Sequence, residues 1–153
     1  MNSKPGHHAL RIGRQSQVEG IYLVTFATAL RCRIFAEFAF ACAVCRTLAP
    51  AARSSEATLL CWVLMPDHFR ALVRLDGEVP LSAVVQRLKS MSTRACHGIQ
   101  PEKIAIWARA FHDHALRRDD DLLRTARYIV ANPVRAGLVK RASEYPFWDA
   151  VWI

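Results

Sequence analysis

The stretch ATLLCWVLMPDHFRALVRL, residues 57–75, decides the fold of this chain. Two of its parts, residues 57–65 and 69–75, are rich in aliphatic and aromatic side chains, a composition that favours buried strands. Pro66-Asp67-His68 lies between them, and proline followed by aspartate is typical of a turn. The stretch therefore predicts two antiparallel strands joined by a short turn.

The segments before this pair predict one strand and one helix. Residues 21–28, IYLVTFAT, are β-branched and aromatic and favour another strand. Residues 34–48, IFAEFAFACAVCRTL, are apolar on all sides and too long for a strand, so they predict a buried helix that stops before Pro50. Residues 1–17 are polar and basic without apolar periodicity, and they predict a flexible basic arm ahead of a single domain, residues 18–153.

The segments after the pair predict two further helices with short strands between them. Residues 81–96 place apolar side chains at helical spacing and basic ones on the outer side, while residues 104–117 alternate loosely, as one or two short strands do. Three aspartates at 119–121 suit the start of a third helix, and Pro133 predicts its end at about the preceding residue. The aromatic side chains within residues 140–153 predict a tail that packs back on the domain.

The order strand, helix, strand, strand, helix, strand is that of a ferredoxin-like α+β fold. Such a domain has an antiparallel sheet with its helices packed on one face. The third helix, which bears a tyrosine, and the aromatic tail are then additions at the C-terminal end. One fold supports many functions, so the function has to be argued from particular residues.

The composition favours a globular protein with a polyanionic partner. Lysine and arginine number 21 against 13 aspartates and glutamates, a formal charge of +8, so nucleic acid is the natural partner, although a solvated basic surface has the same composition. The cysteines are odd in number, 5 in all, and nothing at the N-terminus resembles a secretory leader, which predicts the reducing cytoplasm. The lone CxxC pair, Cys42 and Cys45, is expected to pack in or near the core rather than bind zinc. No apolar run reaches the ~18 residues of a membrane span, so no membrane contact is expected.

The first candidate site lies at the turn between the two central strands. Residues 68 and 70 share a face of a strand because successive side chains alternate. Two histidines at these positions would offer two imidazoles to a metal ion that polarises a phosphate. This chain has His68 followed by Arg70. A single histidine near a turn is more often structural than a ligand, so the pattern alone leaves both interpretations open.

The second candidate site is RYIVANPVRAGLV, residues 127–139. Tyr128 and Asn132 are four residues apart and project from one face of a helix, with Arg124 one turn earlier. A tyrosine can attack a phosphodiester as a covalent nucleophile while a nearby metal ion or guanidinium offsets the charge on the phosphate. From spacing alone, a tyrosine on an apolar helix is more often a core residue with a satisfied hydroxyl.

Five segments resemble, in order and spacing, the REP-associated tyrosine transposases, a family of the HUH superfamily of single-strand transposases. They are IYLVTFAT, WVLMPDHF, LSAVVQRLKS, FHDHALRRDDDLLRTARYIVANPVRAGLV and YPFWDAVW, and the resemblance covers residues 11–153. It implies a ferredoxin-like sheet and a helix-borne tyrosine that cuts single-stranded DNA beside a palindromic hairpin, leaving a 5′-phosphotyrosine and a 3′ hydroxyl. The protein is then expected to be bacterial, cytoplasmic and nucleoid-associated, and to act on single-stranded or hairpin DNA, with a monomer favoured.

Carried over by position, the resemblance makes Tyr128 the nucleophile and makes His68 and Asn132 ligands of a weakly bound Mg²⁺ or Mn²⁺. The second metal histidine of the family is replaced by Arg70, and a guanidinium has no lone pair to give to a metal. It can instead contact the phosphate and supply part of the missing charge. Two functions therefore stay open: a metal-dependent strand transferase impaired by Arg70, or a hairpin-binding protein that has lost cleavage.

Two further sets of residues bear on DNA binding. His112-Asp113-His114 is a second His-x-His pair and a less favoured candidate for the metal site, because the resemblance places it on a strand after the second helix. His114 is expected to support the site from outside the metal ligands. A general RNA-binding module is less favoured because the aromatic RNP signature is absent. The basic residues expected to contact DNA phosphates are Arg11, Arg14, Arg31, Arg33, Arg87, Lys89, Arg94, Arg117, Arg118, Arg124, Arg127 and Arg135.

Overall fold

A computed structural model describes residues 20–117 and 120–152. The expected basic arm, with Arg11 and Arg14, lies outside the described residues, as do Arg118 and Asp119. Within the described part of the chain, no helix is both long enough and apolar enough to cross a bilayer.

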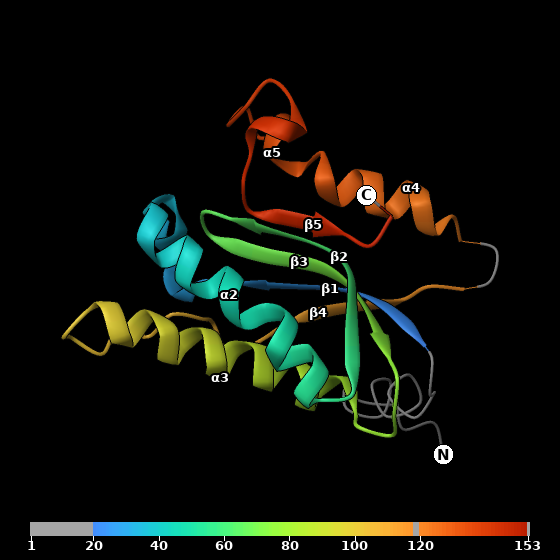
Figure 1. Cartoon of the computed structure of the whole chain (residues 1–153), viewed down its shortest axis with the longest axis horizontal. Coiled ribbons are helices and arrows are strands. Elements are labelled where there is room, and N and C mark those ends of the chain that lie inside the picture. Colours follow the sequence, from blue (N-terminus) through green and yellow to red (C-terminus); the bar gives the residue numbers. More distant parts are fainter. Residues whose placement is uncertain (1–19, 118–119, 153) are drawn as a thin grey trace, which may run out of the picture.

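The described residues form strands, α-helices and short 3-10 helices, which Figure 1 labels along the chain. The strands are β1 Ile21–Ala27, β2 Ala57–Met65, β3 His68–Leu75, β4 His112–Ala115 and β5 Trp148–Ala150. The α-helices are α2 Phe38–Ser54, α3 Leu81–Ile99, α4 Leu122–Val130 and α5 Asn132–Arg135. The 3-10 helices are η1 Ala29–Arg31, η2 Ile34–Ala36 and η3 Ala142–Glu144.

The strands make one sheet in the order β4-β1-β3-β2-β5, with every neighbouring pair antiparallel. The first four strands, with α2 and α3, follow one another as a ferredoxin-like fold requires, so the predicted fold class is confirmed. β5 is an addition from the C-terminal tail, and it pairs with β2.

The β2–β3 hairpin has the predicted form. Met65 pairs with His68, so Pro66 and Asp67 make the turn, and β3 begins one residue earlier than the apolar pattern indicates. Proline suits this turn because its ring fixes φ near about −65°. The early start of β3 places His68 within the regular alternation of the strand, which decides where its side chain points.

The first helix differs from its prediction. α2 begins at Phe38, after η2, and it continues through Pro50 instead of stopping before it. Proline removes one helical hydrogen bond, here the one to the carbonyl of Arg46, and both Pro50 and Arg46 are exposed to solvent. Ala51 and Ala52, which follow the proline, are buried. Their burial beneath the sheet offsets the lost hydrogen bond, and that packing is not visible in the local sequence.

The second helix and the loosely alternating segment agree with their predictions except in length. α3 ends at Ile99, about one turn beyond the predicted end. Within residues 104–117, β4 is the regular strand, and Trp107 pairs with Thr28 in an isolated bridge. This bridge extends the edge of the sheet beyond β4 and fixes the segment that leads from α3 back to the sheet.

The third helix and the aromatic tail also form. The Asp121 side chain caps α4 by accepting a hydrogen bond from the backbone N–H of Arg124 at 2.9 Å. In the tail, Tyr145 and Phe147 are each 9% exposed and pack on the domain as predicted. Trp152 is 42% exposed, so the prediction of a packed tail is wrong for this last aromatic side chain.

The two faces of the sheet are covered differently. α2 and α3 lie on one face and α4 lies across the other (Figure 1). Cys61 on β2 points toward α4, because its thiol donates a hydrogen bond to the carbonyl of Ala126 at 3.6 Å. Cys61 pairs with Leu72 on β3. His68 and Arg70, at even steps from Leu72, therefore point to the α4 face as well.

Candidate active site

Tyr128 lies in the last turn of α4 with its side chain 53% exposed. The chain's other tyrosines, Tyr22 and Tyr145, are 1% and 9% exposed. The hydroxyl of Tyr145 donates to the carbonyl of Leu64, and burial raises the pKa of Tyr145 to about 12. A nucleophile has to reach its substrate. Tyr128 is thus the accessible tyrosine, and it is not the core residue that spacing alone favoured.

His68 and Asn132 meet where β3 begins and α5 begins. The Asn132 amide nitrogen lies 3.3 Å from His68 Nε2, and His68 Nδ1 lies 2.8 Å from an oxygen of Asp67. Nδ1 therefore carries the proton and Nε2 keeps its lone pair in the neutral ring. Burial lowers the pKa of His68, and the charges of Arg70 and Arg31 lower it further, while the hydrogen bond to Asp67 acts in the opposite direction. The imidazole is thus neutral at neutral pH.

Asp67 connects this pair to the loop after β1. Its second carboxylate oxygen lies 3.3 Å from Arg31 Nε, and its carbonyl accepts a hydrogen bond from the Thr28 N–H at 2.9 Å. Partial burial raises the pKa of the Asp67 carboxyl, but the hydrogen bond from His68 and the charge of Arg31 bring it below its ordinary value. The carboxylate stays ionised and fixes the orientation of the imidazole.

Arg135 ties the end of α4 to the start of α5. Its Nη1 donates to the Tyr128 carbonyl at 2.8 Å, and its Nη2 donates to Asn132 Oδ1 at 2.9 Å. The guanidinium carbon also lies 3.6 Å from the centroid of the Tyr128 ring, a cation–π contact. Arg135 therefore holds both the tyrosine ring and the carboxamide in place.

Arg70 approaches the same ring from the sheet. Its guanidinium carbon lies 6.0 Å from the Tyr128 centroid, and its Nε donates to Thr25 Oγ1 on the neighbouring strand at 3.2 Å. Arg70 and Arg135 thus place two permanent positive charges near the candidate nucleophile. Charges placed in this way favour a phosphate beside Tyr128.

The residue types fit two of the three metal ligands that the resemblance implies, because imidazole and amide oxygen both bind divalent ions. His68 Nε2 faces the Asn132 amide nitrogen, and Asn132 Oδ1 accepts a hydrogen bond from Arg135, so the carboxamide has to turn over before its oxygen can join His68 at an ion. The third position holds Arg70, which cannot be a ligand. Across residues 20–117 and 120–152, no group of three His, Cys, Asp or Glu side chains gathers to hold an ion. A metal here would have two protein ligands, with water and phosphate completing its shell.

The second His-x-His pair, residues 112–114, lies on β4 at the edge of the sheet. His112 pairs with Thr25, so both histidines of the pair point to the α4 face. β1 separates them from His68 on β3. His114 lines a cavity of about 400 Å³ together with Arg124. The structure thus brings His114 next to α4, at a distance from the His68–Asn132 pair.

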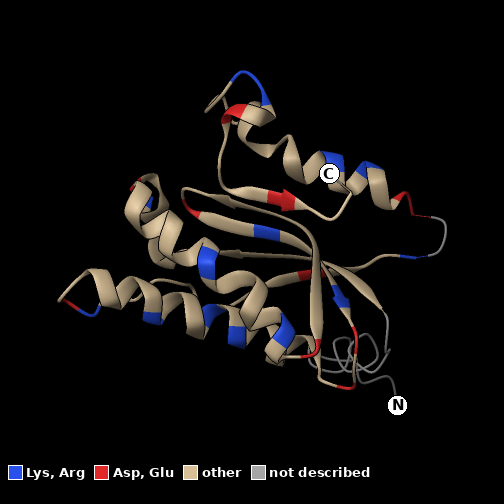
Figure 2. Ribbon diagram, viewed as in Figure 1, with Lys and Arg blue, Asp and Glu red and all other residues tan. Residues whose placement is uncertain are grey.

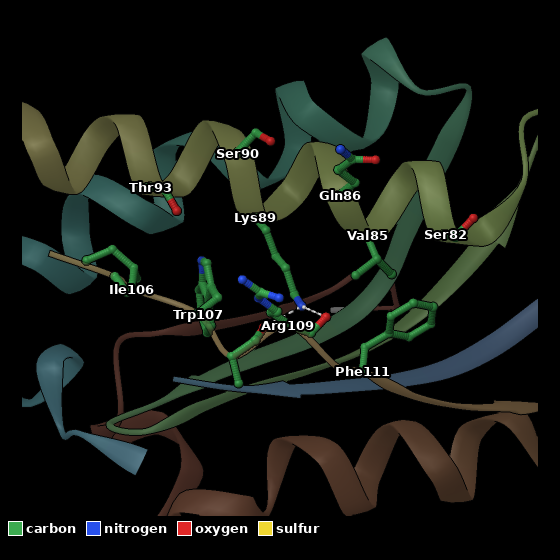
Figure 3. Close-up of a pocket in the computed structure, with 12 residues that line it drawn as sticks. Ser82, Val85, Gln86, Lys89, Ser90, Thr93, Ile106, Trp107, Arg109 and Phe111 are labelled. Carbon is green, nitrogen blue, oxygen red and sulfur yellow. Dashed lines mark hydrogen bonds between the residues drawn. The ribbon is translucent and has the colours of Figure 1, made fainter. Parts of the chain in front are cut away.

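Lysine and arginine are spread over both layers of the molecule (Figure 2). Arg87 and Arg94 are exposed on α3, on the side of the sheet opposite α4. Lys89 lies in a cavity of about 540 Å³ between α3 and residues 105–111 (Figure 3). Its ammonium donates to the carbonyls of Ala108, Arg109 and Ala110 at 2.8, 3.3 and 3.1 Å. Each of its N–H groups has a carbonyl acceptor, so Lys89 fastens α3 to this segment.

The other described arginines of the expected set lie in the loop after β1, ahead of α4, on α4 or on α5. All are exposed: Arg31, Arg33, Arg117, Arg124, Arg127 and Arg135. Sequence reasoning missed two residues of the site, Asp67 and Thr25. The position of Asp67 beside His68 in a turn was a usable signal. Thr25 had none, because its contact with Arg70 depends on how β1 and β3 pair.

The fold and these residues define an α+β domain with an accessible tyrosine on a helix, next to an imidazole, a carboxamide and two guanidinium groups. The chain belongs to the family described as Transposase IS200 like, whose model matches residues 17–132. The match ends at Asn132 and includes His68, Arg70 and Tyr128.

A relative and a solved structure agree with this membership. The REP-associated tyrosine transposase of Escherichia coli (strain K12) is 34% identical over 87 residues, which are 56% of this chain and 50% of that protein. The chain thus spans about half the length of this relative. A solved structure of a REP-associated tyrosine transposase bound to a REP hairpin is similar with a TM-score of 0.72 and 26% identity, over 88% of this chain and 79% of that chain. The resemblance inferred from the sequence is confirmed.

Proposed function

We propose that this protein is a single-strand DNA transposase that nicks and rejoins DNA beside REP-type hairpins, with Tyr128 as its nucleophile. One observation carries the proposal: in a member of this family, the accessible tyrosine lies beside the His68–Asn132 pair and the guanidinium groups of Arg70 and Arg135. The similarity to a transposase bound to a REP hairpin supports hairpin DNA as the partner.

In the proposed reaction, Tyr128 Oη attacks the phosphorus of a phosphodiester in single-stranded DNA. A bond forms between Oη and phosphorus, the bond from phosphorus to the 3′ oxygen breaks, and the 5′ phosphate stays on the tyrosine. The tyrosine proton passes to solvent, and the released 3′ oxygen takes up a proton. Attack by a 3′ hydroxyl on the phosphotyrosine reverses these steps and rejoins the strand.

Charge that builds on the phosphate during attack would be offset by Arg70 and Arg135. His68 Nε2 and the Asn132 carboxamide would hold Mg²⁺ or Mn²⁺, completed by water and the phosphate, and the bound ion would polarise the phosphate. Asp67 keeps the proton of His68 on Nδ1, which leaves the Nε2 lone pair available to bind the ion.

The DNA backbone would be bound by arginines, which set the register of the strand without reading its bases. Lys89 is left out of this set because all three of its N–H groups bond within the protein, whereas the exposed Arg135 uses only two of its five N–H groups in its bonds to Tyr128 and Asn132. We place the protein in the bacterial cytoplasm, associated with the nucleoid and monomeric. The proposed contacts are Arg11, Arg14, Arg31, Arg33, Arg87, Arg94, Arg117, Arg118, Arg124, Arg127 and Arg135.

Replacing Tyr128 with phenylalanine tests the nucleophile. The Tyr128→Phe variant removes only the hydroxyl, so it should form no covalent adduct with a hairpin that carries a single-stranded 5′ extension, while its affinity for that DNA stays within a few fold. Adducts are counted by denaturing gel with Mn²⁺ present, and affinity is measured in EDTA. An adduct that survives the change would place the nucleophile at another residue.

The same assay separates this proposal from a hairpin-binding protein that has lost cleavage because of Arg70. Such a protein would bind the hairpin tightly and form no adduct at any Mn²⁺ concentration. This chain belongs to a transposase family and is similar to a transposase, and neither observation favours the loss of cleavage.

A further inference from the structure

Leu30 is an apolar side chain that the fold leaves in solvent. Its side chain is 100% exposed, more than that of any other large hydrophobic residue in the described parts of the chain. Its backbone has φ 56°, and that of Arg31 has φ 54°. A residue with a β-carbon occupies this left-handed region only at an energetic cost. The fold therefore holds Leu30 in a strained backbone conformation with its side chain in solvent.

Several hydrogen bonds hold this strained turn in place. Thr28 Oγ1 donates to the carbonyls of Cys32 and Asp67, at 2.7 and 3.1 Å. The N–H of Ala29 donates to the Ile106 carbonyl at 2.9 Å. Strain of this kind persists only where the surroundings determine the backbone, and it concentrates at functional sites. The turn is therefore a built feature of the fold.

The turn lies directly beside the candidate active site. Arg31, the next residue after Leu30, is within 3.3 Å of Asp67, which orients His68. Arg33 is also exposed. The tip of the turn thus combines one apolar side chain with two guanidinium groups. A leucine flanked by two arginines is complementary to the end of a DNA duplex. There the last base pair exposes an apolar face between two negatively charged backbones.

We propose that Leu30 is a wedge that packs against the last base pair of the hairpin stem, where the stem meets the single-stranded extension. Arg31 and Arg33 contact the phosphates on either side of it. The wedge rests on the proposed function, since it needs hairpin DNA as the partner. It deepens that function by explaining how the protein finds the junction, next to which Tyr128 must cut.

The variant Leu30→Gly tests the wedge without breaking the fold. Glycine adopts a positive φ at no steric cost, so the variant should unfold at about the same temperature as the parent protein. It should bind a hairpin with a 5′ extension roughly tenfold more weakly, because tenfold corresponds to about 1.4 kcal/mol, which is what burying most of one leucine side chain contributes. The probe is a hairpin with 2-aminopurine at the junction, titrated in EDTA, where loss of stacking changes the fluorescence of the base.

Matched controls separate the wedge from general damage. Leu30→Met keeps an apolar side chain and should keep both affinity and fluorescence change. Val151→Ala shortens another exposed apolar side chain, 58% exposed, which follows β5, an edge strand that β3 and β2 separate from β1, and it should have no effect. Linear single-stranded DNA has no junction, so Leu30→Gly should bind it as the parent does.

Two results would overturn the wedge. One is equal hairpin affinity and fluorescence for the parent and Leu30→Gly, and the other is an equal loss of affinity for hairpin and linear strand, which would make Leu30 a general contact. Failure of the proposed function has a different signature, because the parent itself would then show no preference for the hairpin over a plain duplex.

Discussion

Replacing Arg70 with histidine would restore the imidazole that the resemblance places at this position. Arg70 is two residues from His68 on one strand face, so the two Cα atoms are about 6.6 Å apart at about 3.3 Å per residue, a distance over which two imidazoles can converge on one ion. Changes outside the ligand shell already alter metal affinity by about 10- to 100-fold. A restored ligand should therefore raise Mn²⁺ affinity at least about tenfold.

The change also has costs that can be worked from the structure. Arg70→His removes the hydrogen bond to Thr25 Oγ1, worth about 1 kcal/mol of folding stability at this half-buried position. It also removes a permanent charge within 6.0 Å of the Tyr128 ring. Hairpin affinity in EDTA should fall, while the rate of adduct formation with Mn²⁺ should rise.

Isothermal titration of Mn²⁺ into DNA-free protein measures the metal affinity independently of cleavage. Arg74→His is the matched control: Arg74 lies on the same face of β3, four residues along, and its Nε pairs with Asp76 at 2.6 Å, away from the site. The control should change neither metal affinity nor adduct rate. If Arg70→His also changes neither, and the parent protein already cuts well, then the metal is not held by His68 and Asn132, and residues 112–114 are the next place to test.

Two more predictions concern positioning and burial. Arg135→Ala should slow adduct formation about tenfold while lowering folding stability by only about 1 kcal/mol, because the exposed contacts of Arg135 mainly orient Tyr128 and Asn132. An unchanged rate of adduct formation would show that Arg135 does not position these residues. Burial raises the pKa of the Cys45 thiol to about 12, so this thiol is protonated in the folded protein at pH 8 and does not react readily with iodoacetamide. Peptide mass spectrometry should therefore show that the exposed Cys32 is labelled first. Labelling of Cys45 as fast as Cys32 in folded protein would contradict that burial.

The central hairpin could be predicted from the sequence because its signals are local. Two apolar runs and a Pro-Asp turn determine β2 and β3, whatever the rest of the chain does. The passage of α2 through Pro50 could not be predicted in this way. The proline costs a hydrogen bond within its own turn, while the compensating burial of Ala51 and Ala52 comes from distant parts of the chain.

Some residues of the candidate site could be predicted from the sequence, and others could not. The residue types at Tyr128, His68 and Asn132 stand out in the sequence, since they belong to contiguous motifs. The roles of Arg135 and Lys89 do not, because a basic side chain near a motif looks the same whether it meets phosphate or protein. Only the bend between α4 and α5, and the path of the segment before β4, turn these two charges toward backbone carbonyls.

The two edge strands of the sheet affect how readily the protein associates with its own copies. β4 has four residues and β5 has three, and β4 carries two histidines and Asp113. A long apolar border of unpaired N–H and C=O groups is a template on which another chain can add a strand, and borders that are short or polar resist this. These short edge strands therefore disfavour edge-to-edge aggregation, even though the inner strands β1, β3 and β2 are largely apolar.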